Sequence, residues 1–80
     1  MRVVKEIPYQ HFKLTIFHWN NRYLIKLESG SLEQTFKISE LDVFSEAEVL
    51  ALLDETFLEQ ALHRFDDMAG SLSLAISRHE

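Results

Sequence analysis

An alternation of apolar and polar residues runs from Phe12 to Ser39, with two short interruptions, and it constrains the fold more than any other feature. Side chains on a β-strand point to opposite faces in turn, so such an alternation predicts strands with one apolar face. The interruptions are Asn20-Asn21 and Ser29-Gly30, and asparagine and glycine tolerate the positive φ angles of tight hairpin turns. We therefore expect an antiparallel β-meander with strands near residues 12–19, 22–28 and 32–39.

Two-residue turns at these points fix which residues of neighbouring strands face each other. The first turn pairs Trp19 with Arg22, and the second pairs Leu27 with Leu32. A slip of one residue would exchange the two faces of a strand, so the alternation specifies the register. One face then collects a mostly apolar set: Leu14, Ile16, His18, Tyr23, Ile25, Leu27, Leu32, Phe36 and Ile38.

The second hairpin also carries two polar features. Its register sets Lys26 directly opposite Glu33, which is an attractive pair. Gln34 falls on the apolar face, where its amide needs hydrogen-bond partners. This side chain either bonds to backbone there or marks a place where the covering helices leave a gap.

A further strand is expected before the meander. Val3, Val4 and Ile7 suit a short edge strand near residues 2–7, and Pro8 ends it because proline donates no hydrogen bond to a ladder. Whether this strand joins the sheet stays open, so the expected sheet has three or four strands.

The clearest helix start in the chain follows the sheet. Ser45 and Glu48 form a capping box, and Phe44 and Val49 stand where a hydrophobic staple has its two members. These four residues predict a first helix near residues 46–53.

A second, longer helix is expected near residues 55–78, with Asp54 as its N-cap. Its apolar residues recur at steps of three and four, as in a helix that lies on a sheet. Gly70 weakens the middle of this helix, and residues 71–78 also alternate in the manner of a strand, although helix fits them better. Together the elements predict a single α+β domain over residues 1–80, with both helices packed on one face of the sheet.

Composition narrows the class of protein. The chain has 80 residues and no cysteine, so neither disulfides nor thiolate metal sites brace its small core. Small chains without such braces often gain stability by oligomerising. No apolar run approaches the roughly 20 residues of a membrane span, and the first residues lack the apolar core of a signal peptide. We therefore expect a soluble, cytoplasmic protein without membrane contact.

Charge is distributed unevenly along the chain. Residues 1–39 hold six basic and three acidic side chains, whereas residues 40–80 hold two basic and ten acidic ones. A mildly basic sheet and a strongly acidic helical half argue against binding to double-stranded DNA, which needs a concentrated positive surface. The acidic residues fit the solvent-facing sides of the helices.

No group of residues predicts catalysis, a metal site or a cofactor. On a helix, Glu59, His63 and Asp67 share one face, but residues at this spacing pair routinely, and we interpret them as an exposed polar stripe. His18 is expected opposite Tyr23 with no nucleophile or carboxylate beside it, which is typical of a hydrogen-bonded histidine at the edge of a core. The chain also lacks a phosphate loop and a dinucleotide fingerprint. We therefore expect that the protein is not an enzyme.

The second face of the sheet carries the candidate binding residues. The register gathers Phe17, Trp19 and Leu24 there, beside Arg22 and Lys26. A solvated sheet face ordinarily carries polar residues, so contiguous apolar side chains suggest that something binds.

Three explanations of this face remain open. The first strand or a chain terminus covers it, or a second copy or another protein covers it, since Trp, Phe and Arg favour interfaces. In the third explanation single-stranded nucleic acid stacks on the aromatic rings, with its backbone against three lysines: Lys13, Lys26 and Lys37.

The segments FKLTIFHWNNRYLIKLESGSLEQTFKISELDV and LLDETFLEQALHRFDDM resemble a group of short bacterial proteins with no assigned function. This resemblance covers most of the chain and implies no catalytic residue, cofactor or partner. The order of four strands and then helix also resembles the repeat of the Whirly and Pur-type single-strand nucleic-acid binders, in element order alone.

These observations predict a non-enzymatic module for protein interaction or self-association, as a homodimer or with an unidentified protein partner. Its binding surface is either the aromatic sheet face or the C-terminal helix. The alternative is a single-stranded nucleic-acid-binding module that stacks bases on the same aromatic face.

Overall fold

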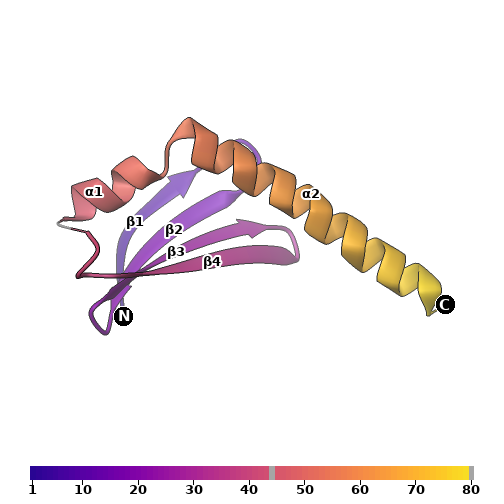
Figure 1. The fold of residues 1–80 in the computed structure, drawn as a ribbon, viewed down its shortest axis with the longest axis horizontal. Coiled ribbons are helices and arrows are strands. Elements are labelled where there is room, and N and C mark those ends of the chain that lie inside the picture. Colours follow the sequence, from indigo (N-terminus) through magenta and orange to yellow (C-terminus); the bar gives the residue numbers. More distant parts are fainter. Residues whose placement is uncertain (44, 80) are drawn as a thin grey trace.

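Four strands and then two helices form the chain in the computed structural model, which describes residues 1–43 and 45–79 (Figure 1). The elements are β1 (Arg2–Pro8), β2 (Lys13–Trp19), β3 (Arg22–Ser29), β4 (Leu32–Ser39), α1 (Glu46–Leu52) and α2 (Glu55–Arg78). The strands make one antiparallel sheet in the order β1-β2-β3-β4, and both helices lie on the same face of it. The predicted α+β fold and meander are confirmed, and every predicted boundary lies within one residue of the observed one.

The β2–β3 hairpin has the predicted turn and register. Asn20 and Asn21 occupy the turn with φ angles of 53° and 62°. Trp19 pairs with Arg22, and the pairing runs without irregularity to the far end of β2. The two turn residues therefore adopt the left-handed conformation that asparagine tolerates.

The predicted register of the second hairpin is wrong by two residues along β4. The turn is Gly30-Ser31 rather than Ser29-Gly30, so Ser29 pairs with Leu32 and Leu27 pairs with Gln34. Gly30 has a φ of 61° at the first turn position, where a glycine-led hairpin turn needs a positive angle and where serine would be strained. A shift of two preserves the faces, so the alternation could not distinguish the two registers.

β1 joins the sheet, which settles the open number of strands at four. It pairs antiparallel with β2, and a bulge at Val4 separates the pair formed by Val3 and Phe17 from the pair formed by Lys5 and Ile16. Val4 and Ile7 pack against the core. Pro8 ends the strand as predicted.

The core lies between the sheet and the helices. Its buried apolar residues are Phe12, Leu14, Ile16, Tyr23, Ile25, Leu27, Val43, Val49, Ala61 and Phe65. Phe65 of α2 meets Phe12, with the ring centroids 5.4 Å apart, and Phe57 of α2 meets Phe36 of β4 at 5.2 Å. The apolar face predicted from the alternation is therefore the face that the helices cover.

Both helices begin at the predicted caps. The Ser45 hydroxyl accepts a hydrogen bond from the backbone N–H of Glu48 at 3.2 Å, and the Asp54 carboxylate accepts one from Phe57 at 2.8 Å. Phe44, expected in a hydrophobic staple, lies outside the described residues. α2 continues through Gly70 to Arg78, so residues 71–78 are helical as favoured.

α2 extends past the end of the sheet. Its first half lies over the strands, and its second half projects beyond the turn that joins β3 and β4 (Figure 1). Neither helix in the described part of the chain has the length and apolar character that crossing a membrane would require.

Candidate functional site

The five candidate binding residues lie together on the face of the sheet opposite the helices. Phe17 pairs with Leu24 and Trp19 pairs with Arg22 across the β2–β3 ladder, and Lys26 follows on β3. The Trp19 side chain is 50% exposed, whereas Phe17 and Leu24 are only partly exposed. The apolar part of this face is therefore concentrated at Trp19.

β1 does not lie across this face. It sits beside β2 in the plane of the sheet, where it sets the exposed Val3 next to Phe17. α2 lies on the opposite face, with its C-terminal end beyond the sheet (Figure 1). Among the described residues, neither β1 nor α2 therefore provides the cover that the first explanation requires.

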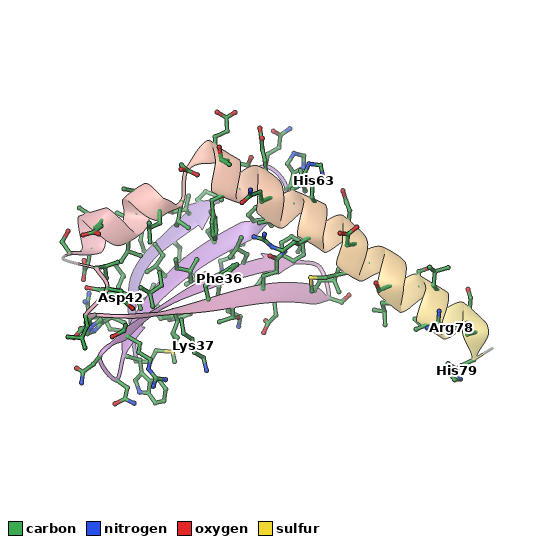
Figure 2. The ribbon with its side chains drawn as sticks, viewed as in Figure 1. Phe36, Lys37, Asp42, His63, Arg78 and His79 are labelled. Atoms are coloured by element: carbon green, nitrogen blue, oxygen red, sulfur yellow. The ribbon has the colours of Figure 1, made fainter. Side chains whose placement is uncertain are left out.

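Two of the three lysines proposed to hold a nucleic-acid backbone are paired with carboxylates. Lys13 Nζ lies 3.7 Å from Glu6, and Lys26 Nζ lies 3.4 Å from Glu33. Glu33 was predicted directly opposite Lys26, and in the observed register it reaches this lysine diagonally, because Lys26 pairs with Thr35. Lys37 points away from the helices (Figure 2) and has no ion pair within the described residues. The carboxylates beside Lys13 and Lys26 therefore reduce the positive potential of this face.

A polar cluster lies at the end of the sheet where β1 begins and β2 ends, near the start of α1. His18 Nε2 is hydrogen-bonded to a carboxylate oxygen of Glu40, and its ring lies 4.9 Å from that of Tyr23. The expectation that no carboxylate accompanies this histidine is therefore wrong, because the segment after β4 folds back and brings Glu40 to it.

Arg2 belongs to the same end of the sheet. Its guanidinium donates a hydrogen bond to Glu46 at 2.7 Å, which joins the start of β1 to the start of α1. This hydrogen bond and the charge of the Glu46 carboxylate raise the pKa of Arg2 above its usual value. The cluster ties β1, β2 and α1 together, and it holds no serine, threonine or cysteine that these groups would activate.

The remaining titratable side chains do not converge. His63 points away from the sheet on the outer side of α2 (Figure 2). No three histidine, aspartate or glutamate side chains in the described ranges gather to hold a metal ion. Glu59 and Asp67 are exposed beside His63, as the predicted polar stripe requires.

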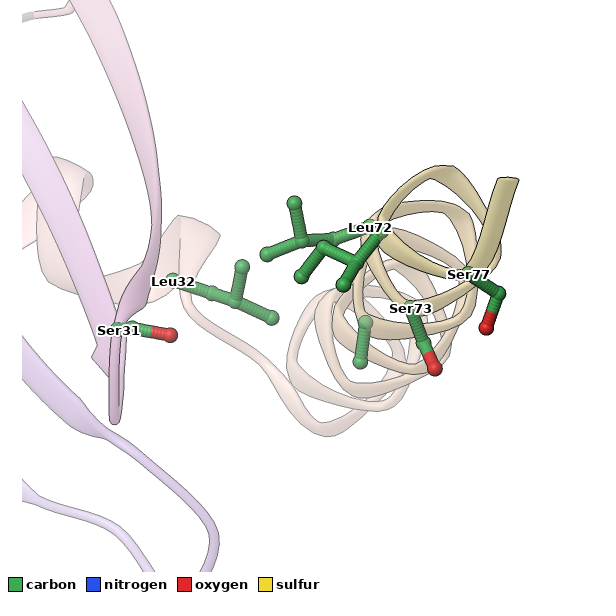
Figure 3. Close-up of a pocket in the computed structure, with 7 residues that line it drawn as sticks. Ser31, Leu32, Leu72, Ser73 and Ser77 are labelled. Atoms are coloured by element: carbon green, nitrogen blue, oxygen red, sulfur yellow. The ribbon is translucent and has the colours of Figure 1, made fainter. Parts of the chain in front are cut away.

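Exposed apolar residues also occur on the projecting half of α2, on both sides of the helix. Leu72, Leu74 and Ile76 are 49%, 64% and 53% exposed, and the segment from Ala69 to Ser77 contains no charged residue. On the side of the sheet, this segment and Leu32 line an open groove of about 310 Å³ (Figure 3). Its lining residues are Ser31, Leu32, Ala69, Leu72, Ser73, Ile76 and Ser77.

The sequence contains a signal for this surface, although the groove itself was not predicted. The apolar stripe that packs against the core through Phe65 and Met68 continues at the same spacing to Leu72 and Ala75, past the part of α2 that packs there. The predicted register placed Leu32 two residues away from its true position, so the other wall of the groove was missed.

Comparison with known proteins does not assign this chain to a family. No protein-family model, curated protein or solved structure matches this chain. The likeness to short bacterial proteins thus stays a resemblance, and the proposals below rest on the geometry alone.

Proposed function

We propose that this protein is a non-enzymatic interaction module that associates with a second copy of itself through the projecting half of α2. The observation that carries the proposal is the pair Leu72 and Ile76, each about half exposed along a groove whose other wall is Leu32. Fully burying an exposed leucine or isoleucine contributes about 1.5–3 kcal/mol, so half-exposed side chains forgo roughly half of that each. A partner that fills the groove recovers part of this free energy.

Electrostatics favours a second copy as the partner. Residues 40–80 carry a strong excess of acidic side chains, so most of the helical surface repels an identical molecule. The segment from Ala69 to Ser77 is the stretch of α2 where two copies meet without that repulsion. A small chain without disulfides also gains stability from such an association.

A single-stranded nucleic-acid binder is the second candidate. It is favoured by Trp19, which is half exposed beside Arg22, and by Lys37, which has no ion pair in the part of the chain that the structure describes. The carboxylates beside Lys13 and Lys26 count against it, because they compete with phosphate for both lysines. We place the protein in the cytoplasm in either case, since a chain without cysteine suits a reducing compartment.

Light scattering over a concentration series tests the proposed function. We expect the unmodified chain to dimerise, and we expect Leu72→Asp to shift the equilibrium toward monomer. Leu74→Asp is the matched control, because Leu74 lies about 200° around the helix from Leu72 and outside the groove. A chain that stays monomeric at every concentration, or equal effects of the two variants, would contradict the proposal.

A further inference from the structure

The two edges of the sheet are built differently. β1 has a bulge at Val4 and ends in Pro8, and both features hinder pairing with another strand. β4 runs for eight residues with no proline and no register shift against β3. Natural sheets rarely leave a regular edge of this length unprotected. The β4 edge therefore has the form of a surface for strand addition.

The backbone groups on this edge follow from the turn. In a hairpin with a two-residue turn, the pair of residues next to the turn exchanges backbone hydrogen bonds, and here that pair is Ser29 and Leu32. Every second residue of β4 after Leu32 is likewise hydrogen-bonded to β3. The residues between them send their N–H and C=O groups to the open edge, and these are Glu33, Thr35 and Lys37. All three side chains are exposed. Within the described residues, no hydrogen bond to another segment occupies this edge.

We propose that β4 pairs antiparallel with β4 of a second copy, in a register centred on Thr35, so that two sheets become one of eight strands. This inference rests on the proposed function, namely self-association, and it names the contact that sets the geometry. A two-fold axis through such a pair places Thr35 opposite Thr35 of the partner subunit. Glu33 then lies opposite Lys37 of the partner subunit, twice in the dimer.

Side-chain complementarity selects this register. Lys37 has no carboxylate partner in its own chain among the described residues, and in the dimer it gains one. On the helix side, Leu32 lies opposite Ile38 of the partner subunit, which makes an apolar pair. A shift of two residues keeps the faces but sets Lys37 opposite Thr35 in one direction or Ser31 in the other, and both charge pairs are lost.

The same two-fold axis also accounts for the projecting half of α2. Antiparallel pairing brings the Gly30-Ser31 end of one sheet next to the Ser39 end of the other. α2 projects beyond the Gly30-Ser31 end, and the residue two past Ser39, Leu41, is 94% exposed. The apolar segment of each helix therefore lies at the end of the partner's sheet, where an exposed leucine is available.

A charge exchange tests the register. We expect Lys37→Glu and Glu33→Lys each to weaken the dimer by at least about tenfold in Kd, because two attractive pairs become repulsive. The double variant, with both substitutions, restores the opposite charges and brings the Kd back to within about threefold of the unmodified chain. Lys5→Glu, on the exposed β1 edge, is the control and leaves the Kd unchanged.

A backbone variant tests the edge itself. Thr35→Pro removes an N–H that points away from β3, so the fold tolerates it as edge strands tolerate proline, while strand addition is blocked. Circular dichroism checks that the variant is folded, and sedimentation equilibrium measures its Kd. We expect a folded monomer.

The outcomes separate this inference from the proposed function. Weakened single variants with a restored double variant support the Thr35 register. A dimer that Thr35→Pro and Lys37→Glu leave unchanged overturns edge pairing and leaves self-association through α2 in place. Weakened single variants without restoration overturn the register. A monomer at every concentration overturns both proposals.

Discussion

Arg64 of α2 donates a hydrogen bond from Nε to the side-chain oxygen of Gln34 on β4, at 2.8 Å. The amide of Gln34 in turn donates to the backbone carbonyl of Ala61 at 2.9 Å. The polar side chain of Gln34, which the alternation placed on the apolar face, is therefore hydrogen-bonded to the helix above it. Of the two explanations offered for Gln34, the bond to backbone is the correct one.

Replacing Gln34 by leucine tests this contact. We expect Gln34→Leu to lower the free energy of unfolding by about 1–2 kcal/mol, because the Arg64 guanidinium and the Ala61 carbonyl both lose a partner in a partly buried site. Urea denaturation measures the change. Gln60→Leu, the same substitution at an exposed position of α2, is the control and should alter stability by less than about 0.5 kcal/mol. Equal losses in the two variants would contradict this role for Gln34.

The N-cap of α2 gives a second prediction. Asp54 accepts a hydrogen bond from Phe57 at the helix start, so Asp54→Ala should cost about 1 kcal/mol. Asp66→Ala removes the same charge from an exposed position inside the helix and should cost much less. Thermal unfolding of both variants checks the difference. A smaller loss for Asp54→Ala than for Asp66→Ala would argue against the cap.

Gly70 gives a third prediction, with the opposite sign. It lies inside α2, and a Cβ added there would meet no atom within 4 Å. Gly70→Ala should therefore stabilise the protein by about 0.5–1 kcal/mol through helix propensity. Chemical denaturation in dilute solution, where the chain is monomeric, measures the gain. A loss of stability there would mean that a neighbouring group approaches Gly70 closely.

The nucleic-acid alternative has a direct optical test. Trp19 is the only tryptophan of the chain, and it is half exposed, so bases stacked on its ring would quench its fluorescence. We expect no change on addition of single-stranded oligonucleotides at physiological salt. Quenching that weakens as salt is raised would favour the nucleic-acid binder instead. The Trp19→Ala variant has no tryptophan, so its binding is measured by the fluorescence polarisation of a labelled oligonucleotide, and a loss of binding there would also favour the nucleic-acid binder.

Much of the fold followed from local chemistry. Three local signals each specify a geometry that the structure reproduces. They are the two asparagines at the first turn, the alternation that places Ile16 and Ile25 on the buried face, and the helix caps at Ser45 and Asp54. These signals act over a few residues, so one sequence is sufficient to detect them.

The features that the sequence did not predict depend on contacts between distant segments. The β3–β4 register was missed because a shift of two residues leaves both faces intact, and only the φ of Gly30 distinguishes the two turns. Glu40 was not expected beside His18, since the fold-back after β4 has no local signature. The groove beside Leu32 depends on that same register and on how far α2 runs past the sheet.

The absence of cysteine makes a direct measurement of the central claim possible. A single thiol introduced by Leu72→Cys reports whether the groove face of α2 is covered, and Leu74→Cys reports on the other side of the helix. We expect the rate of thiol labelling at position 72 to fall several-fold as protein concentration is raised through the dimerisation range, while the rate at position 74 changes little. Equal labelling rates at position 72 in dilute and concentrated solution would contradict self-association through the projecting half of α2.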